Sequence, residues 1–307
     1  MKVLVTGGYG FIGSHTVEQL IKRGHEVVII DDLSTGKLSN LTHVEDKIEF
    51  IDQDICSLDI DYLREVVSEV DVVIHLAALV SVQESINNPT ESFKRNCESF
   101  HKLLISLKGL GVPIVYASSA AVYGDSEHGI LSPMSPYAAD KITNEMYAES
   151  FGLSYNVSSI GMRYFNVYGT RQDPKSPYAG VIAKFVDCLK NDQDICIYGS
   201  GSQTRSFINV RDIAKFNVDA AEFLDGYVKN NPHLRWISKV DVGYPETISI
   251  IDLAKIIKSK NPTIQITFAE PKIGEVLHSK PFMNAFMKKD KESLVSLEKG
   301  IEELIAS

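Results

Sequence analysis

The chain has 307 residues, of which 44% are hydrophobic and 23% charged, as is typical of a globular protein with one large or two modest domains. Its formal net charge of −9 excludes a broad basic surface, so we expect no nucleic-acid and no membrane partner. No apolar run reaches the roughly 20 residues that a membrane-spanning helix needs, and the first residues do not form a signal-peptide pattern.

The first thirty residues predict a βαβ unit. Residues 2–6 are apolar and β-branched, residues 11–24 repeat apolar side chains at helical spacing, and residues 26–30 form a continuous apolar strand. Further strands and helices alternate after it, which is typical of a parallel sheet covered on both faces. The strands are predicted at 48–52, 71–77, 113–118 and 156–164, and the helices at 58–69, 89–109 and 138–152.

The pattern becomes less regular from about residue 166. Helices are predicted within 179–191 and 248–261, and isolated strands at 194–199 and 264–269. The last stretch, 288–307, is predicted to be a solvated amphipathic helix.

A glycine-rich loop stands between the first predicted strand and the first predicted helix. It reads GGYGFIG, residues 7–13, and fits a G-x-G-x-x-G pattern. Glycines let the backbone approach a pyrophosphate, whose charge then lies at the helix N-terminus. Asp31 ends the next strand, 18 residues after Gly13. A carboxylate there accepts hydrogen bonds from both ribose hydroxyls and repels a 2′-phosphate, so the pattern favours NAD over NADP. An empty glycine turn in an ordinary α/β fold is the alternative.

These features predict an α/β protein with a Rossmann-type, doubly wound parallel sheet and a smaller C-terminal α/β region. We expect residues 1–165 to form the NAD-binding domain, rejoined by a segment near 200–222, and residues 166–307 to form mainly the substrate-binding region. The four cysteines form no CxxC pair and the eight histidines no ligand spacing. We therefore expect free thiols in a reducing cytoplasm and no metal site.

The sequence resembles the extended short-chain dehydrogenases, and within them the nucleotide-sugar epimerases and dehydratases. The similarity runs from residue 1 to about residue 280 and is greatest to the UDP-hexose 4-epimerases. The motifs that carry it are VTGGYGFIGSH, DDLSTG, HLAA, SSAAVYG, SPYAADK, RYFNVYG and SQTRSFINVRD. The resemblance implies that Asp54 and Ile55 hold the adenine and that Leu76, Ala77 and Ala78 line the dinucleotide. The full set expected to bind the cofactor is Gly7, Gly10, Phe11, Ile12, Gly13, Asp31, Asp32, Ser34, Asp54, Ile55, Leu76, Ala77, Ala78, Asn96, Tyr137, Lys141 and Tyr164.

Tyr137, Lys141 and Ser119 are the candidate catalytic residues. Tyr137 opens a predicted helix and Lys141 stands four residues later, so the two share a helix face. A nearby ammonium and the positive nicotinamide would favour the phenolate, making Tyr137 a plausible general base near neutral pH. Ser119, at the end of its strand, can bond the same substrate hydroxyl. An ordinary helix tyrosine and a turn hydroxyl are the alternatives.

The resemblance implies oxidation of the sugar at C4, and the residues after Ser119 bear on the fate of the keto sugar. In related 4,6-dehydratases an Asp-Glu pair follows the catalytic hydroxyl residue, and in UDP-glucuronate decarboxylases a Glu takes the second position. Here the two residues are Ala120 and Ala121. Without those carboxylates the simplest outcome is rotation of the keto sugar and reduction on its other face, which is 4-epimerisation.

The resemblance also implies a substrate end. Asn166 and Arg205 would bind the diphosphate of a UDP-sugar, and a guanidinium suits that role, although a solvated surface arginine is the alternative. Lys272 stands where the family usually has an arginine, Leu277 replaces another, and Val80 replaces a lysine. Ser279 lies where a small residue admits an N-acetyl group, which favours tolerance of UDP-GlcNAc and UDP-GalNAc beside UDP-Glc and UDP-Gal.

Four further expectations follow. A UDP-glucuronate 4-epimerase remains an alternative substrate assignment. A 4-keto-sugar reductase would need an exchangeable reduced cofactor, commonly NADPH, which Asp31 disfavours. A dinucleotide-sensing regulator without chemistry is the non-enzymatic alternative, although such proteins often lose the tyrosine or lysine. Family members often dimerise through two helices, which correspond to residues 92–109 and 138–152, so we expect a homodimer.

Overall fold

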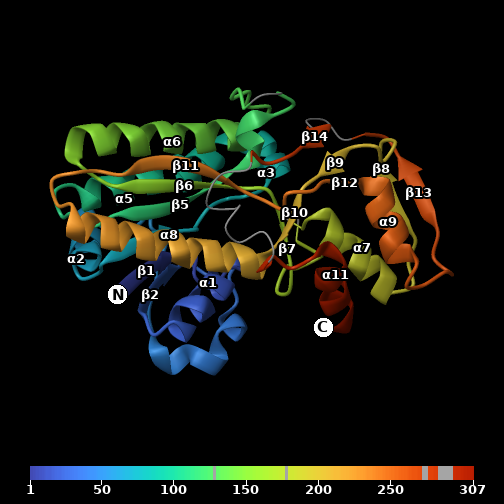
Figure 1. Ribbon diagram of the computed structural model, residues 1–307, viewed down its shortest axis with the longest axis horizontal. Coiled ribbons are helices and arrows are strands. Elements are labelled where there is room, and N and C mark those ends of the chain that lie inside the picture. The colour runs from blue at the N-terminus through green and yellow to red at the C-terminus, as the bar shows by residue number, and fades with distance from the viewer. Residues whose placement is uncertain (127–128, 177–178, 272–275, 283–292) are drawn as a thin grey trace.

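The computed structural model describes residues 1–126, 129–176, 179–271, 276–282 and 293–307. Within this described part a parallel sheet of seven strands has the order β11-β6-β5-β4-β1-β2-β3 (Figure 1). Its strands are β1 (Lys2–Thr6), β2 (Glu26–Asp31), β3 (Ile48–Asp52), β4 (Val72–His75), β5 (Ile114–Ser119), β6 (Ser159–Tyr164) and β11 (Ile237–Val242). The order reverses between β1 and β4, so the carboxyl ends of these two strands open a crevice. The predicted doubly wound Rossmann-type α/β class is confirmed.

Alternate residues along the strands supply two separate cores. On β1, Val3 and Val5 belong to one apolar cluster and Leu4 to the other, as the period of a strand requires. The first core is covered by α1 (Phe11–Lys22) and α8 (Val210–Asn230). The second is covered by α2 (Ile60–Ser68), α5 (Ser99–Leu107) and α6 (Pro136–Tyr155). Each fully buried Val, Leu or Ile contributes roughly 1.5–3 kcal/mol through burial, which fixes the sheet and therefore the strand ends.

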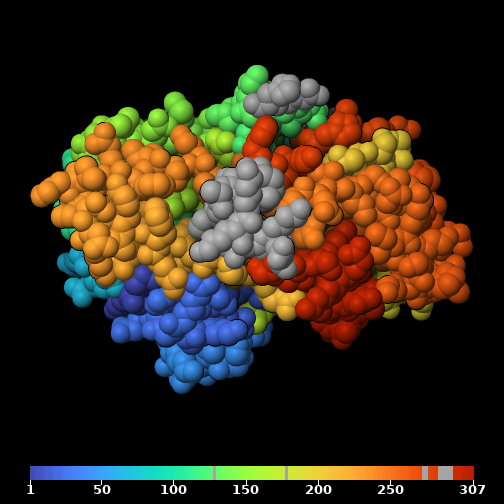
Figure 2. Space-filling model, viewed as in Figure 1, coloured from blue at the N-terminus to red at the C-terminus, as the bar shows by residue number. Residues whose placement is uncertain are grey.

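Two elements of the sheet layer come from far along the chain. β11 pairs in parallel with β6, with Ile237 opposite Ser159 and Val242 opposite Tyr164. Helix α8 lies beside α1, as the adjoining orange and blue surfaces in Figure 2 show. Residues 210–242 thus pack with the first part of the chain, and the predicted domain boundary at residue 165 stays a prediction.

The smaller region stands at one end of the sheet (Figure 1). Its helices are α7 (Val181–Lys190), α9 (Ile250–Lys258) and α11 (Leu297–Ala306). They enclose an apolar core with Ile195 of β8 (Ile195–Tyr198), which pairs in parallel with β13 (Ile266–Ala269). Between this region and the main sheet lie short strands: β7 (Asn166–Tyr168) with β10 (Phe207–Asn209), and β9 (Thr204–Arg205) with β12 (Ile248–Ser249) and β14 (His278–Ser279).

Two predicted helices differ from the observed ones. The stretch 89–109 is not uniform, because α4 (Pro89–Phe93) is followed by a π-helical turn, η3 (Lys94–Glu98), before α5 begins. The C-terminal helix predicted over 288–307 is shorter in the structure, as the described residues 293–307 show. Ser296 caps α11, which begins only at Leu297, and Ile301 is buried in the smaller core instead of facing solvent; residues 288–292 lie outside the described residues. A short helix, α3 (Val82–Asn87), was not predicted.

Among the described residues, none of the helices combines the length and the apolar character that crossing a membrane requires.

Candidate active site

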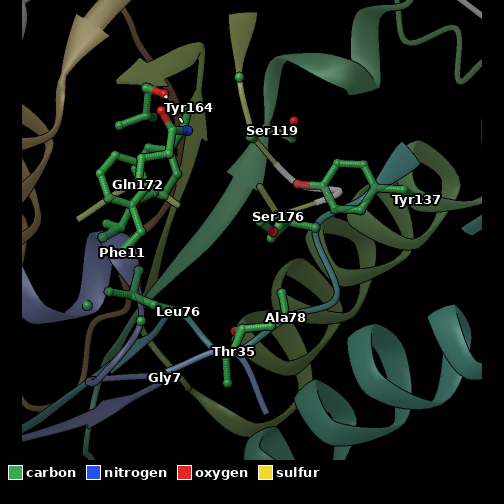
Figure 3. Close-up of a pocket in the computed structure, with 18 of the residues that line it drawn as sticks. Gly7, Phe11, Thr35, Leu76, Ala78, Ser119, Tyr137, Tyr164, Gln172 and Ser176 are labelled. Atoms are coloured by element: carbon green, nitrogen blue, oxygen red, sulfur yellow. Dashed lines mark hydrogen bonds between the residues drawn. The ribbon is translucent and has the colours of Figure 1, made fainter. Parts of the chain in front are cut away.

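A cavity of about 730 Å³ lies at the carboxyl ends of the sheet strands and extends to the smaller region. Most residues predicted for the site line it together. They are Gly7, Gly10, Phe11, Ile12, Gly13, Asp31, Asp32, Ser34, Asp54, Ile55, Leu76, Ala77, Ala78, Ser119, Tyr137, Tyr164, Asn166, Arg205 and Ser279. Figure 3 shows Tyr137 and Ser119 on one side of this cavity and Gly7, Phe11 and Leu76 on the other.

The glycine loop is shaped by contacts that leave no room for side chains. A Cβ on Gly13 would lie 2.0 Å from the carbonyl oxygen of Gly7. Gly7 itself has φ +68°, and its Cβ would lie 2.8 Å from the backbone nitrogen of Ala77. Gly10 is the N-cap of α1 and has no side chain to bond the first-turn amides. The positive end of α1 therefore faces the cavity at a place where backbone and ligand can approach closely, which fits a pyrophosphate.

Asp31 is held in place by backbone donors. Its Oδ2 accepts from the Tyr9 amide at 2.8 Å and its Oδ1 from the Leu33 amide at 2.9 Å. Burial raises the pKa of this carboxyl, and these two hydrogen bonds oppose that rise. Each carboxylate oxygen has a further lone pair, so the group can also accept from two ribose hydroxyls.

Asp32 stands beside a cation that the sequence reasoning missed. The Arg95 guanidinium donates to Asp32 Oδ2 at 3.1 Å, and Ser34 Oγ donates to Asp32 Oδ1 at 2.6 Å. The pKa of Asp32 lies below its usual value. Burial alone would raise it, but the hydrogen bonds from Ser34 and the charge of Arg95 have the larger, opposite effect. Arg95 lines the cavity as well. The one sequence signal for it is Glu91 four residues earlier, a spacing that allows the ion pair seen between them.

The loop after β4 is held by a buried side-chain pair. Thr6 Oγ1 lies 2.8 Å from His75 Nδ1 and accepts from the amides of Leu76 and Ala77, both at 3.2 Å. Burial is the main reason why the pKa of His75 falls to about 3, so its ring stays neutral at physiological pH. The neutral Nδ1 can then accept the Thr6 proton, which fixes the backbone that lines the cavity.

Ser119 and Tyr137 meet at the end of β5 and the start of α6. Ser135 caps α6, and Pro136 sets its first turn, which brings Tyr137 into the cavity wall. The phenol of Tyr137 points towards Ser119 (Figure 3) and shares a hydrogen bond with it. Lys141 Nζ lies 5.6 Å from the centre of the Tyr137 ring and donates to the Ala117 carbonyl at 2.9 Å.

Burial dominates the pKa values of both Tyr137 and Lys141. Burial raises the pKa of the phenol to about 12, while the Ser119 bond lowers it and the charge of Asp140 raises it. Burial also lowers the pKa of Lys141 to about 8. The prediction that this ammonium together with the positive nicotinamide favours the phenolate stays a prediction.

Asn96 and Lys141 belong to the supporting structure of the cavity instead of its lining. Asn96 lies in the π-helical turn, accepts from the Leu79 amide at 2.8 Å and donates to the Leu79 carbonyl at 3.1 Å. Its amide nitrogen also donates to Asp140 at 3.1 Å. These bonds connect α6 to the loop 76–81, and any cofactor contact of Asn96 stays a prediction.

The substrate end is built from short strands. Asn166 donates to the Ser206 carbonyl at 3.1 Å, and Ser279 pairs with Arg205 across β14 and β9. The Arg205 guanidinium donates to the carbonyls of Thr204, Val276 and Leu277. Lys272 lies outside the described residues.

Two residues of the cavity wall were missed because no motif marks them. Arg171 has φ +69°, an unusual backbone conformation for its residue type. Within the described residues, Arg171 Nη1 and Gln172 Oε1 are buried without a hydrogen-bond partner, and both residues line the cavity. Such groups are free to bond a polar ligand.

Comparison with known proteins agrees with this geometry. Residues 3–232 match the model of the NAD dependent epimerase/dehydratase family. The UDP-glucose 4-epimerase of Mycolicibacterium smegmatis is 38% identical over 69% of this chain and 71% of its own. The UDP-N-acetyl-alpha-D-glucosaminuronate decarboxylase of Bacillus cytotoxicus is 32% identical over 93% and 86%. The solved UDP-N-acetylglucosamine 4-epimerase of Methanobrevibacter ruminantium, in complex with UDP-N-acetylmuramic acid, has a TM-score of 0.88 and 34% identity, covering 99% and 97%.

The fold and the cavity therefore define a Rossmann-type, NAD-dependent enzyme. This chain belongs to the NAD-dependent epimerase/dehydratase family. The relatives named above are enzymes of nucleotide sugars. Its cofactor is NAD, with which several structural neighbours have been solved. The relatives include epimerases, decarboxylases and dehydratases, so the family alone leaves the fate of the sugar open.

Proposed function

We propose that the chain interconverts the C4 epimers of a UDP-hexose, UDP-Glc with UDP-Gal, UDP-GlcNAc with UDP-GalNAc, or both pairs. The observation that carries this proposal is the pair Ala120 and Ala121. Both line the cavity directly after Ser119, where a carboxyl acid or base would be needed for elimination or decarboxylation. Because alanine methyl groups can act neither as acid nor as base, the simplest fate of a 4-keto sugar here is reduction on its other face, which is 4-epimerisation.

The residues fit NAD at the end of the cavity formed by the glycine loop. The N-terminus of α1 would hold the pyrophosphate, Asp31 the adenosine ribose, and Asp54 and Ile55 the adenine. When bound, the oxidised cofactor supplies the acceptor for the C4 hydride and later its donor. Asp31 favours the form without a 2′-phosphate, because its carboxylate, held in place by two backbone bonds, would repel that phosphate.

Tyr137 is the proposed acid–base group. Its phenol oxygen removes the proton of the C4 hydroxyl during oxidation and returns it during reduction, while Ser119 bonds the same oxygen atom of the sugar. Because burial raises the pKa of Tyr137 to about 12, the proposal requires a fall of this pKa in the complex. The positive charges of Lys141 and of the oxidised cofactor are the proposed source. Lys141 is held beside the ring by its bond to Ala117.

The remaining assignments extend this proposal. Arg205, Asn166 and Lys272 would bind the diphosphate, and Ser279 would leave room for an N-acetyl group. We further propose a cytoplasmic homodimer formed through helices within residues 92–109 and 138–152. Met146 and Leu153 on α6 are 63% and 58% exposed, which supports an apolar contact there. Sedimentation at micromolar concentration tests the dimer, and a clean monomer would count against it.

The test is direct conversion. Purified protein is incubated separately with UDP-Glc, UDP-GlcNAc and UDP-GlcA without added reductant, and the anomeric proton signals are followed by NMR. The proposal expects the matching 4-epimer without net NADH. Conversion of UDP-GlcA alone, with its carboxylate retained, would instead support a UDP-glucuronate 4-epimerase. Release of carbon dioxide or dependence on NADPH would overturn the proposal in favour of a decarboxylase or a 4-keto-sugar reductase.

A further inference from the structure

The segment 276–282, which we call the strap, runs beside the substrate end of the cavity. Val276 and Ser279 line the cavity itself. On one side the strap pairs with β9, where the amides of Thr204 and Ser206 donate to the carbonyls of Leu277 and Ser279, both at 3.0 Å. The position of the strap therefore decides how much room the substrate end offers.

The other side of the strap contacts the loop that follows Ser119. The Leu277 amide donates to Asp125 Oδ1 at 2.5 Å. The Phe282 ring lies 5.9 Å from the Tyr123 ring in an edge-to-face arrangement. The strap thus joins the short strands that carry Arg205 to the loop that begins with Ala120 and Ala121.

A buried carboxylate, Asp241, binds both the strap and the loop that follows Ser119. Asp241, in β11, is only 5% exposed. Its Oδ2 accepts from the Phe282 amide at 2.8 Å, and its Oδ1 accepts from the Tyr123 hydroxyl at 2.6 Å. The Tyr123 oxygen in turn accepts from Arg163 at 2.6 Å, so its own hydrogen is directed to Asp241.

Arg163 anchors the far end of the same chain of bonds. It donates to both oxygens of Glu145 in α6, at 2.8 and 2.6 Å, and Ser118 donates to Glu145 at 2.6 Å. Ser118 precedes Ser119 on β5. A buried, charge-assisted network therefore leads from beside the catalytic serine, through Arg163 and Asp241, to the backbone of the strap.

We propose that Asp241 is a positioning residue that fixes the strap, and through Val276 and Ser279 sets how tightly the sugar end of the substrate is bound. The residue type is specific. Two donors, the Tyr123 hydroxyl and the Phe282 amide, converge on its two oxygens, and a carboxylate accepts from both. An asparagine is neutral and presents one oxygen and one NH₂ group. If the NH₂ group faces the Phe282 amide, two donors meet; if it faces Tyr123, the hydroxyl must accept from both this NH₂ group and Arg163 and can no longer donate to the side chain at position 241.

The inference rests on the proposed function for its substrate, and Asp241→Asn is therefore tested by two separate readouts. The first needs no substrate: amide hydrogen exchange of the strap in the NAD-loaded protein. We expect the Phe282 amide to exchange at least about tenfold faster than in the wild type. Unchanged protection of Phe282 would overturn the anchor whatever the enzyme's substrate is.

The second readout is kinetic and compares UDP-Glc with UDP-GlcNAc. We expect KM to rise roughly tenfold and kcat to change less than about threefold, because Ser119, Tyr137 and Lys141 keep their places. The kcat/KM ratio of the two sugars should shift several-fold. A fall in kcat at constant KM would overturn the positioning role. Failure of both proteins to convert either sugar would refute the proposed function, and the exchange result would still decide the anchor.

Two variants serve as controls. Asp212→Asn changes another buried carboxylate that accepts a backbone bond, from the Val295 amide at 3.0 Å, and that does not line the cavity. It should leave strap exchange and the sugar ratio as in the wild type. Tyr123→Phe removes the other donor to Asp241 but keeps the ring and the Phe282 bond. If it accelerated strap exchange as much as Asp241→Asn, the effect would come from general loosening and the proposed anchor would be wrong.

Discussion

The two ends of the cavity are built in different ways. At the cofactor end, the part of the wall that suits a pyrophosphate is backbone: Gly7, Gly10 and Gly13, the N-terminus of α1, and the loop 76–78 held by Thr6 and His75. At the substrate end, the wall is made by side chains from two- and three-residue strands and from the strap. The first depends on a seven-stranded sheet, and the second on a few hydrogen bonds between segments distant in the sequence.

This difference separates what must stay constant from what can vary. Strand ends in a doubly buried sheet move little, because a shift would disturb two cores at once. The substrate end can change its shape by substitutions in loops without disturbing that sheet. A family can therefore keep one cofactor and one oxidation step while it exchanges substrates and the fate of the keto sugar.

Tyr137→Phe should have the largest effect. It removes the proposed acid–base oxygen and keeps the ring that forms the cavity wall. We expect kcat to fall by roughly 10³-fold, with NAD content and thermal stability close to the wild type. The NMR assay measures the loss of conversion, and the absorbance of the bound cofactor measures the NAD content. Substantial residual turnover would move the acid–base role to another group.

Gly13→Ala tests the backbone wall of the cofactor end. The added Cβ would lie 2.0 Å from the Gly7 carbonyl oxygen, so the loop must shift. We expect NAD affinity to fall by about 100-fold or more, measured by calorimetry on cofactor-stripped protein.

A matched control is Gly226→Ala in α8, where a Cβ meets nothing within 4 Å. This change should leave NAD affinity unchanged and raise the free energy of unfolding by roughly 0.5–1 kcal/mol. Equal losses of affinity in both variants would mean that NAD binding does not depend on the close approach at Gly13.

Lys141→Met separates catalysis from stability in the cofactor-free protein. Because burial lowers the pKa of Lys141 to about 8, the ammonium destabilises the folded state below that pH. The variant should lose activity but gain on the order of 1–3 kcal/mol in the free energy of unfolding at pH 7. Above pH 8 the folded wild type releases the proton before the unfolded chain does, so the gain should shrink as pH rises. Denaturant unfolding at pH 7 and 9 checks the sign, and a gain that grows with pH would contradict it.

Arg205→Lys should have the smallest effect and probes the substrate end. A lysine keeps the charge but loses the fork that now holds the carbonyls of Thr204, Val276 and Leu277. We expect KM for the UDP-sugar to rise about tenfold with NAD affinity unchanged. A change in NAD affinity of similar size would show that the two ends are not independent.

The same contrast explains what the sequence could predict. Glycines at fixed spacing, Asp31 at a strand end and Tyr137 with Lys141 on one helix face are local patterns, and each reached the cavity or its immediate support. No local pattern indicates that burial raises the pKa of Tyr137 to about 12, because the groups that bury this phenol come from elements far apart in the chain. Arg171, Gln172 and Asp241 have no local signal, because their positions depend on tertiary packing. The start of α11 was misplaced because the amphipathic spacing includes residues 293–296, which precede the helix in the structure.

The late arrival of β11 has a consequence for how the chain is made. β6 ends at Tyr164, and the strand that pairs with its outer edge begins only at Ile237, about 70 residues later. At roughly 5–20 residues per second, the ribosome needs several seconds to deliver that strand. During this interval β6 has unpaired backbone groups, and the face reserved for α8 is uncovered. The nascent chain therefore passes through a period in which its nearly complete sheet is open to the wrong strand, and the docking of α8 and β11 ends it.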